Sequence, residues 1–166
     1  MMLRELFDTL EASGLAEHIR ENDNLFPLIE SLHVVAVSLV VGSIFAVDLR
    51  LLGVSWTARP ASRVANGILP LTWAAFALAA CTGGLMFISH AVKYLGNACF
   101  DAKLLLIAVA GINMVVFHLI ASRDQARWDV QARPPFKARV AGGLSIALWI
   151  SVVACGRWIG FTMEVG

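Results

Sequence analysis

One long apolar run limits the folds open to this chain more than any other feature. Between Glu30 and Asp48 the only ionisable side chain is that of His33. A helix needs about 20 apolar residues to cross the roughly 30 Å hydrocarbon core of a bilayer. With its apolar flanks, this run is long enough for a membrane span, and an ionisable group inside a span marks a candidate functional site.

Three further runs of similar length follow, and the predicted spans cover residues 28–52, 67–92, 103–122 and 139–162. The chain is 58% hydrophobic and 15% charged, with a mean hydropathy of +0.74. Soluble domains are usually about a quarter charged. Because the connections are short, we expect an all-α, integral membrane four-helix bundle of up-down topology.

The first 24 residues differ from the spans. Leu3, Leu6, Phe7 and Leu10 recur at helical spacing with acidic residues between them, and Ser13-Gly14 interrupts the pattern. This spacing predicts one or two amphipathic helices at the membrane surface or on the bundle, although a loosely ordered tail has the same composition. We therefore divide the chain into an amphipathic segment, 1–24, and a four-span domain, 25–166.

The basic residues predict the orientation, because cytoplasmic loops are enriched in Lys and Arg. We call the side with both termini side A and the side with the 53–66 and 123–138 connections side B. Eight of the thirteen Lys and Arg residues belong to side B, which we expect to be cytoplasmic: Arg50, Arg59, Arg63, Arg123, Arg127, Arg133, Lys137 and Arg139. The net charge of +1 gives no indication of a nucleic-acid partner.

Two histidines are predicted near side A on neighbouring spans, His33 on the first and His90 on the second. Histidines at one level on facing helices are the usual ligands of six-coordinate haem b in a bundle. Gly83, two turns before His90, would leave a flat gap for the porphyrin. Lys103 and Arg157, at the side-A ends of the last two spans, would neutralise its propionates.

Other interpretations fit the same residues. The two histidines could instead bind helix ends, with glycine serving helix packing and Lys103 and Arg157 belonging to an interfacial belt. A metal ion held by His33, His90 and His118 is a further possibility.

His118 is predicted near side B, at the level of Asp48 and Arg50, with Asn113 nearby. It could ligate a second haem, pair with His33 if the helices tilt, or bind a quinone while Asp48 relays a proton. It could also belong to a structural polar cluster with Asp48 and Arg50, because unpaired polar groups are costly in lipid.

The sequence also resembles a known group of proteins. The stretches Leu25–Gly53, Ser89-His90-Ala with Tyr94, Phe100–Lys103, Asn113–His118 and Gly156-Arg157-Trp158 are similar to small bacterial four-span membrane proteins of largely unknown function. More distantly, the chain resembles HemJ-type protoporphyrinogen oxidases and the copper-resistance protein D family. The first resemblance implies that His33 is a haem ligand and Lys103 an essential residue.

From these residues we expect a b-type cytochrome of the bacterial inner membrane, with both termini in the periplasm. It would transfer electrons between a partner protein and the quinone pool. The alternatives are a membrane enzyme that oxidises porphyrins and a cofactor-free accessory or transport subunit of a larger complex. Association of the chain into a homo-oligomer is compatible with each of these.

Overall fold

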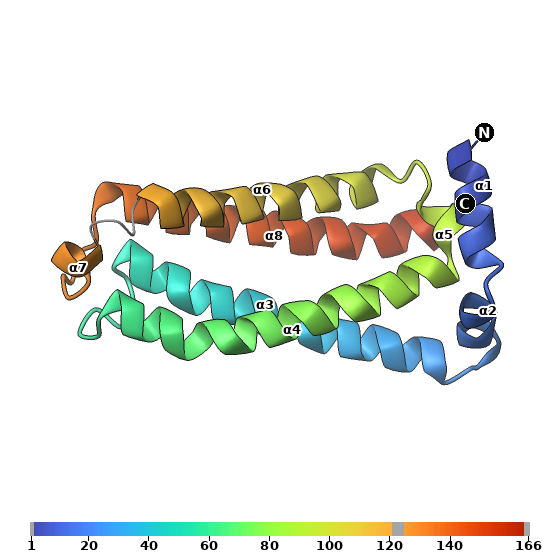
Figure 1. Cartoon of the computed structure of the whole chain (residues 1–166), viewed down its shortest axis with the longest axis horizontal. Coiled ribbons are helices and arrows are strands. Elements are labelled where there is room, and N and C mark those ends of the chain that lie inside the picture. The colour runs from blue at the N-terminus through green and yellow to red at the C-terminus, as the bar shows by residue number, and fades with distance from the viewer. Residues whose placement is uncertain (1, 121–124, 165–166) are drawn as a thin grey trace.

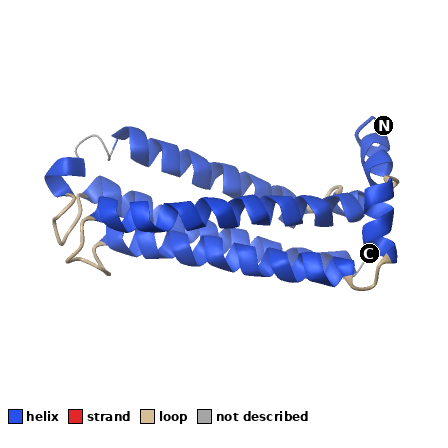
Figure 2. Cartoon of the chain, turned by 60° about the horizontal axis from the view of Figure 1, so that its bottom comes forward, coloured by secondary structure: helices blue, strands red, loops and turns tan. Residues whose placement is uncertain are grey.

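The computed structural model describes residues 2–120 and 125–164, and most of them are helical. Four helices are long and apolar enough to cross a membrane: α3 (Leu25–Leu52), α4 (Ala61–Ser89), α6 (Ala98–Ile120) and α8 (Phe136–Glu164). They run alternately in opposite directions, and no strand occurs among the described residues (Figures 1 and 2). The predicted all-α up-down bundle is confirmed, and the chain is a multi-pass membrane protein.

Each long helix begins three to six residues earlier than its predicted span. The prediction followed the apolar run, whereas helical structure continues outward through polar residues such as Arg63, Asp101 and Lys137. At its other end α4 stops at Ser89, so His90 lies outside the helix that was predicted to contain it. Residues 121 and 122, the predicted end of the third span, lie outside the described ranges.

The four helices pack as two pairs, α3 with α4 and α6 with α8, which appear as two layers in Figure 1. The layers are joined mainly through packing of α3 against α8. Gly142 on α8 makes this packing close, because a Cβ atom there would lie 3.1 Å from both the carbonyl oxygen of Asp48 and the Cβ of Leu51. A larger side chain at Gly142 would push the two layers apart.

Polar side chains determine the register of α3 against α4. His33 Nδ1 lies 2.9 Å from Thr82 Oγ1, and the Thr72 hydroxyl donates to Ser43 Oγ at 2.9 Å. Ten residues separate the two partners on each helix, so both bonds belong to one antiparallel alignment. Between these two hydrogen bonds, the facing surfaces of α3 and α4 contain small or β-branched residues such as Ala36, Val40 and Ala75, which are buried.

The amphipathic segment forms two helices, α1 (Met2–Glu11) and α2 (Gly14–Glu21), which cross the side-A end of the bundle (Figures 1 and 2). The break falls at Ser13, whose hydroxyl oxygen accepts from the Ala16 amide as an N-cap. Glu11 accepts from the backbone amide of Val92 in the short helix α5 (Ala91–Tyr94), and Arg20 donates to the carbonyl of Ser89. The segment is therefore docked on the ends of α4 and α5.

Arg50 closes the opposite end of the bundle. Its side chain is fully buried, and its guanidinium donates to three backbone carbonyls in the side-B connections: those of Arg59, Asp129 and Gln131. The Asp129 carboxylate in turn accepts from the backbone and hydroxyl of Ser62 in the first turn of α4. One cation thus ties α3 to the segment that follows α7 (Gln125–Trp128) and to the start of α4.

We expect Arg50→Ala to lower the free energy of unfolding by about 3 kcal/mol or more, because three carbonyls lose a charged donor. The matched control is Arg63→Ala, which removes an exposed arginine from α4 and should change that free energy by less than about 0.5 kcal/mol. Denaturant unfolding of the purified protein in detergent measures both. Equal effects of the two variants would contradict the role given to Arg50.

Candidate functional site

The side-A half of the bundle brings two ionisable side chains from different spans into the same region. His33 extends from α3 toward Thr82 and Gly83 of α4, and the Lys103 ammonium of α6 is near enough to interact electrostatically with His33. Lys103 itself lies against Gly156 of α8. All four spanning helices therefore contribute to one region, which we call the His33–Lys103 site.

The hydrogen bonds of Thr82 favour one tautomer of His33. A hydroxyl carries one proton, and Thr82 Oγ1 lies 2.7 Å from the backbone carbonyl of Leu78 and 3.3 Å from that of Ala79. With the Thr82 proton on a carbonyl, Oγ1 accepts from the Nδ1–H of His33. In that tautomer the lone pair resides on Nε2, the arrangement found when a histidine binds a metal through one nitrogen and is oriented through the other.

Gly83 has a different neighbour from the one predicted. A Cβ atom at Gly83 would lie 3.0 Å from His33 Cε1 and 3.5 Å from its Nδ1. The space that glycine provides is thus occupied by the imidazole of His33 itself, rather than being a gap for a porphyrin. Gly83 allows the ring to approach α4 closely enough to reach the Thr82 hydroxyl.

Lys103 is half-buried and lacks an acceptor. A Cβ atom on Gly156 would be 3.6 Å from the Lys103 amine, so the lysine lies directly over this glycine. Within residues 2–120 and 125–164 the amine forms neither a hydrogen bond nor an ion pair. An ammonium without an acceptor inside a membrane protein is costly, which makes Lys103 a candidate partner for an anionic group of a ligand.

His90 does not lie beside His33. It is the C-cap residue of α4, eight residues beyond Thr82, which corresponds to about 12 Å along the helix axis. Its ring instead meets Phe26 edge-on, with the ring centroids 5.2 Å apart, and Phe26 lies two turns before His33 on α3. The predicted pairing of His33 and His90 around one haem therefore does not form in this arrangement, because the register of α4 places Thr82, and not His90, beside His33.

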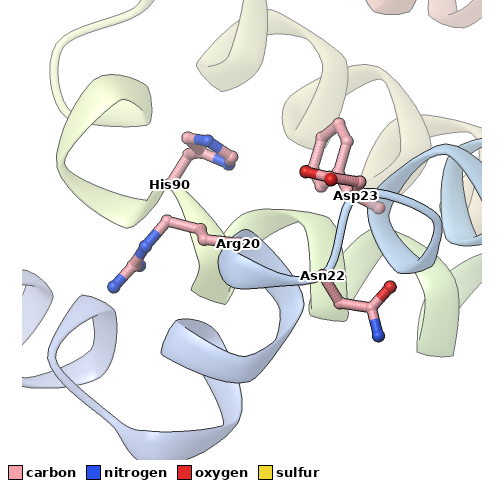
Figure 3. A pocket seen from close by; sticks show the side chains of 5 residues that line it. Arg20, Asn22, Asp23 and His90 are labelled. Atoms are coloured by element: carbon pink, nitrogen blue, oxygen red, sulfur yellow. The ribbon is translucent and has the colours of Figure 1, made fainter.

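His90 instead borders an open pocket of about 440 Å³ at the side-A surface, which Figure 3 shows. The residues that line it are Arg20, Asn22, Asp23, Phe26 and His90. Within it, His90 Nδ1 lies 3.0 Å from the hydroxyl of Ser89, whereas Arg20 extends away from the ring to the Ser89 carbonyl (Figure 3). The pocket is a surface feature at the junction of the amphipathic segment and the bundle.

Arg157 is also separate from the site. Its guanidinium lies over the ring of Phe161, 5.2 Å from the centroid, and the side chain is exposed. Gly156 faces Lys103, so the next residue along α8 points in another direction. The structure does not bring Lys103 and Arg157 together as two propionate partners.

The four residues predicted near side B have different neighbours. His118 is exposed on α6 and its ring bonds to the carbonyl of Met114, while Asn113 donates to the carbonyl of Ala141 on α8. Asp48 is buried between α3 and α8, and Arg50 is bound to the side-B connections. None of these contacts joins two of the four residues.

His33, His90 and His118 likewise do not form a common metal site among the residues that the structure describes. No group of three or more His, Cys, Asp or Glu side chains suited to a metal ion occurs in the described parts of the chain. His33, His90 and His118 lie at three different levels of the bundle.

Two residues of the site were missed in the sequence. Thr82 orients His33, and Gly156 provides the surface on which Lys103 lies. Thr82 lies ten residues from Thr72 on α4, as His33 does from Ser43 on α3, and this shared spacing of polar residues was the available signal. No comparable pattern in the sequence indicates Gly156.

Residues 22–162 match DUF6644, a family of unknown function. The chain belongs to this family. No curated protein and no solved structure matches the chain, and the comparisons give no support to a similarity with HemJ-type oxidases or copper-resistance protein D. The DUF6644 match begins after α2, so it covers the four spans and not the two amphipathic helices.

Titration of His90 tests the geometry of the side-A surface. Burial, followed by the positive charges of Lys93 and Arg20, lowers the pKa of His90 below its ordinary value of 6.5, while Glu11 acts in the opposite direction. We expect an NMR titration of its ring to show a midpoint below 6.5, and we expect Lys93→Ala to raise that midpoint. The exposed Arg157→Ala variant, which removes a charge not acting on His90, should leave it unchanged.

The sign of the linked stability follows from this shift. The folded chain binds fewer protons at His90 than the unfolded chain between the two pKa values, so stability rises with pH through that interval and is lost as the pH falls. A midpoint at or above 6.5 would show that burial and the charges of Lys93 and Arg20 do not lower the pKa of His90 as described.

Proposed function

We propose that this protein binds haem b through His33 and Lys103 and transfers electrons within the membrane. The observation that carries the proposal is the orientation of His33. Its imidazole is held through Nδ1 at the Thr82 hydroxyl and also interacts with the backbone of Ala79, Nε2 is the nitrogen we assign to a ligand, and a lysine without an acceptor lies nearby in the same half of the bundle. Haem b is a cofactor with both complementary features, an iron atom and carboxylate groups.

Each residue of the site has a defined task in this proposal. His33 would supply an axial nitrogen to the iron, and its bond to Thr82 would fix the ring and raise the basicity of Nε2. Lys103 would neutralise a propionate. Bound there, haem would supply a one-electron redox centre.

The proposal differs from a bis-histidine cytochrome in one respect. His90 and His118 lie at other levels, so this chain offers His33 as its single axial histidine in the arrangement seen. The site lies between spanning helices, within the hydrocarbon phase in which quinones dissolve. We therefore include electron exchange with membrane quinones in the proposal, together with exchange with a partner protein.

A second function is favoured by a specific observation. The resemblance to HemJ-type enzymes implied roles for His33 and Lys103, and the positive charge of Lys103 acts on His33 in the bundle. Oxidation of protoporphyrinogen is therefore the alternative to pure electron transfer. Growth of a strain that lacks protoporphyrinogen oxidase, when it carries this gene, would favour the enzyme.

Haem binding can be tested by the dithionite-reduced minus oxidised spectrum of the purified protein, with the haem quantified as the pyridine haemochrome. We expect a b-type α-band in the wild type and in His90→Ala and His118→Ala, and its loss in His33→Ala. Circular dichroism and gel filtration would show whether His33→Ala is folded. A colourless wild type that stays colourless after haem is added would exclude the proposal, as would full haem content in His33→Ala.

Lys103 is tested by haem titration of the apoprotein. Lys103→Met keeps the length and apolar stem of the side chain and removes its charge, so we expect about tenfold weaker haem binding, the equivalent of about 1.4 kcal/mol. Lys93→Met is the control, because Lys93 is an exposed lysine at the same end of the molecule. Equal affinities of the two variants would remove Lys103 from the site.

A further inference from the structure

Asp48 is a carboxylic acid enclosed within the bundle. It lies on α3 four residues before the helix ends, which places it about 6 Å inside the side-B end of the helix. Its side chain is only 5% exposed, because the backbone of α8 at Gly142 is in contact with the backbone of Asp48. The close approach of the two helices leaves the carboxyl between them.

The carboxyl is only partly satisfied. The side chain of Ser145 on α8 is near enough to interact with it, while its Oδ2 atom is buried and has no hydrogen-bond partner. A carboxyl oxygen without a hydrogen-bond partner can bind a proton instead.

No cation neutralises Asp48 among the described residues. The charged groups on the helices packed around this end are Arg50 on α3 itself, Arg63 on α4, and Arg139 and the exposed Lys137 on α8. Arg50 is bound to three loop carbonyls, Arg63 is exposed, and Arg139 lies one turn closer to side B than Gly142. Burial of a carboxylate ion without a partner costs several kcal/mol, so a site like this favours the neutral acid.

We propose that Asp48 is a proton-binding site that exchanges protons with the aqueous phase on side B. The step is the reversible transfer of one proton from water or a buffer acid on side B to the carboxyl, where Oδ2 is the unoccupied acceptor. No electron moves and no covalent bond other than the O–H bonds changes. Ser145 holds the other part of the carboxyl in place. The proposal does not depend on haem, because Asp48 and His33 lie near opposite ends of α3.

Dicyclohexylcarbodiimide provides a direct test, because it reacts with protonated carboxyls in apolar surroundings. After reaction in detergent, mass spectrometry of the peptides should show at least tenfold more adduct at Asp48 than at the exposed Asp101, and the Asp48 adduct should decrease as the pH rises through the neutral range. Asp48→Asn should abolish the adduct on that peptide. Labelling of Asp48 that equals that of Asp101, or that does not change with pH, would overturn the proposal.

Infrared spectroscopy covers the case in which the reagent cannot reach the site. The wild type should show the C=O stretching band of a protonated carboxylic acid, shifted in D₂O and missing in Asp48→Asn, whereas Asp101→Asn should keep it. Absence of a band assigned to Asp48 would show that the group is ionised and would refute proton binding. In proteoliposomes of one orientation the band should respond to the pH on side B. A response to side A alone would refute the proposed access.

Discussion

A polar side chain inside a bilayer has no water to bind, and this constraint organises α3 and the helices around it. His33, Ser43 and Arg50 lie on one face of α3 at helical spacing, and each finds its partner on α4 or in the side-B connections. Because misaligned polar groups would be left unsatisfied in hydrocarbon, these bonds select one register between α3 and α4. The positions of Thr82 and Gly83 beside His33 follow from that register, whereas Lys103 and Gly156 are placed by the packing of α8 against α3 and α6.

The same constraint separates structural polar groups from candidate functional ones. Arg50 is buried deeply, but most of its donors are used by backbone carbonyls, so its role is to hold the side-B end together. Asp48 Oδ2, Arg50 Nη1 and Arg139 Nε are buried without a hydrogen-bond partner in the described parts of the chain, where the half-buried amine of Lys103 also has no acceptor. Of these groups, Lys103 and Asp48 lie toward opposite sides of the membrane, and they are the two to which we assign a ligand and a proton.

The architecture could be predicted from the sequence because long apolar runs and short connections allow few arrangements in a membrane. The candidate site could be predicted only in part. His33 and Lys103 were identified because ionisable residues stand out in apolar runs, but whether His90 belongs with them depended on the register of α4 against α3. That register sets His33 beside Thr82, eight residues before His90. Arg157 shows the same limit, because adjacent helical residues point in different directions and periodicity alone did not orient α8.

The docking of the amphipathic helices imposes an order on biosynthesis. Arg20 and its acceptor, the carbonyl of Ser89, are 69 residues apart in the chain. At a translation rate of about 5–20 residues per second, α1 and α2 leave the ribosome on the order of ten seconds before their binding surface exists. During that interval the apolar faces of α1 and α2 can bind the membrane surface instead. The contact seen in the finished protein can then form only after the second span has been made, while α6 and α8 still follow in the chain.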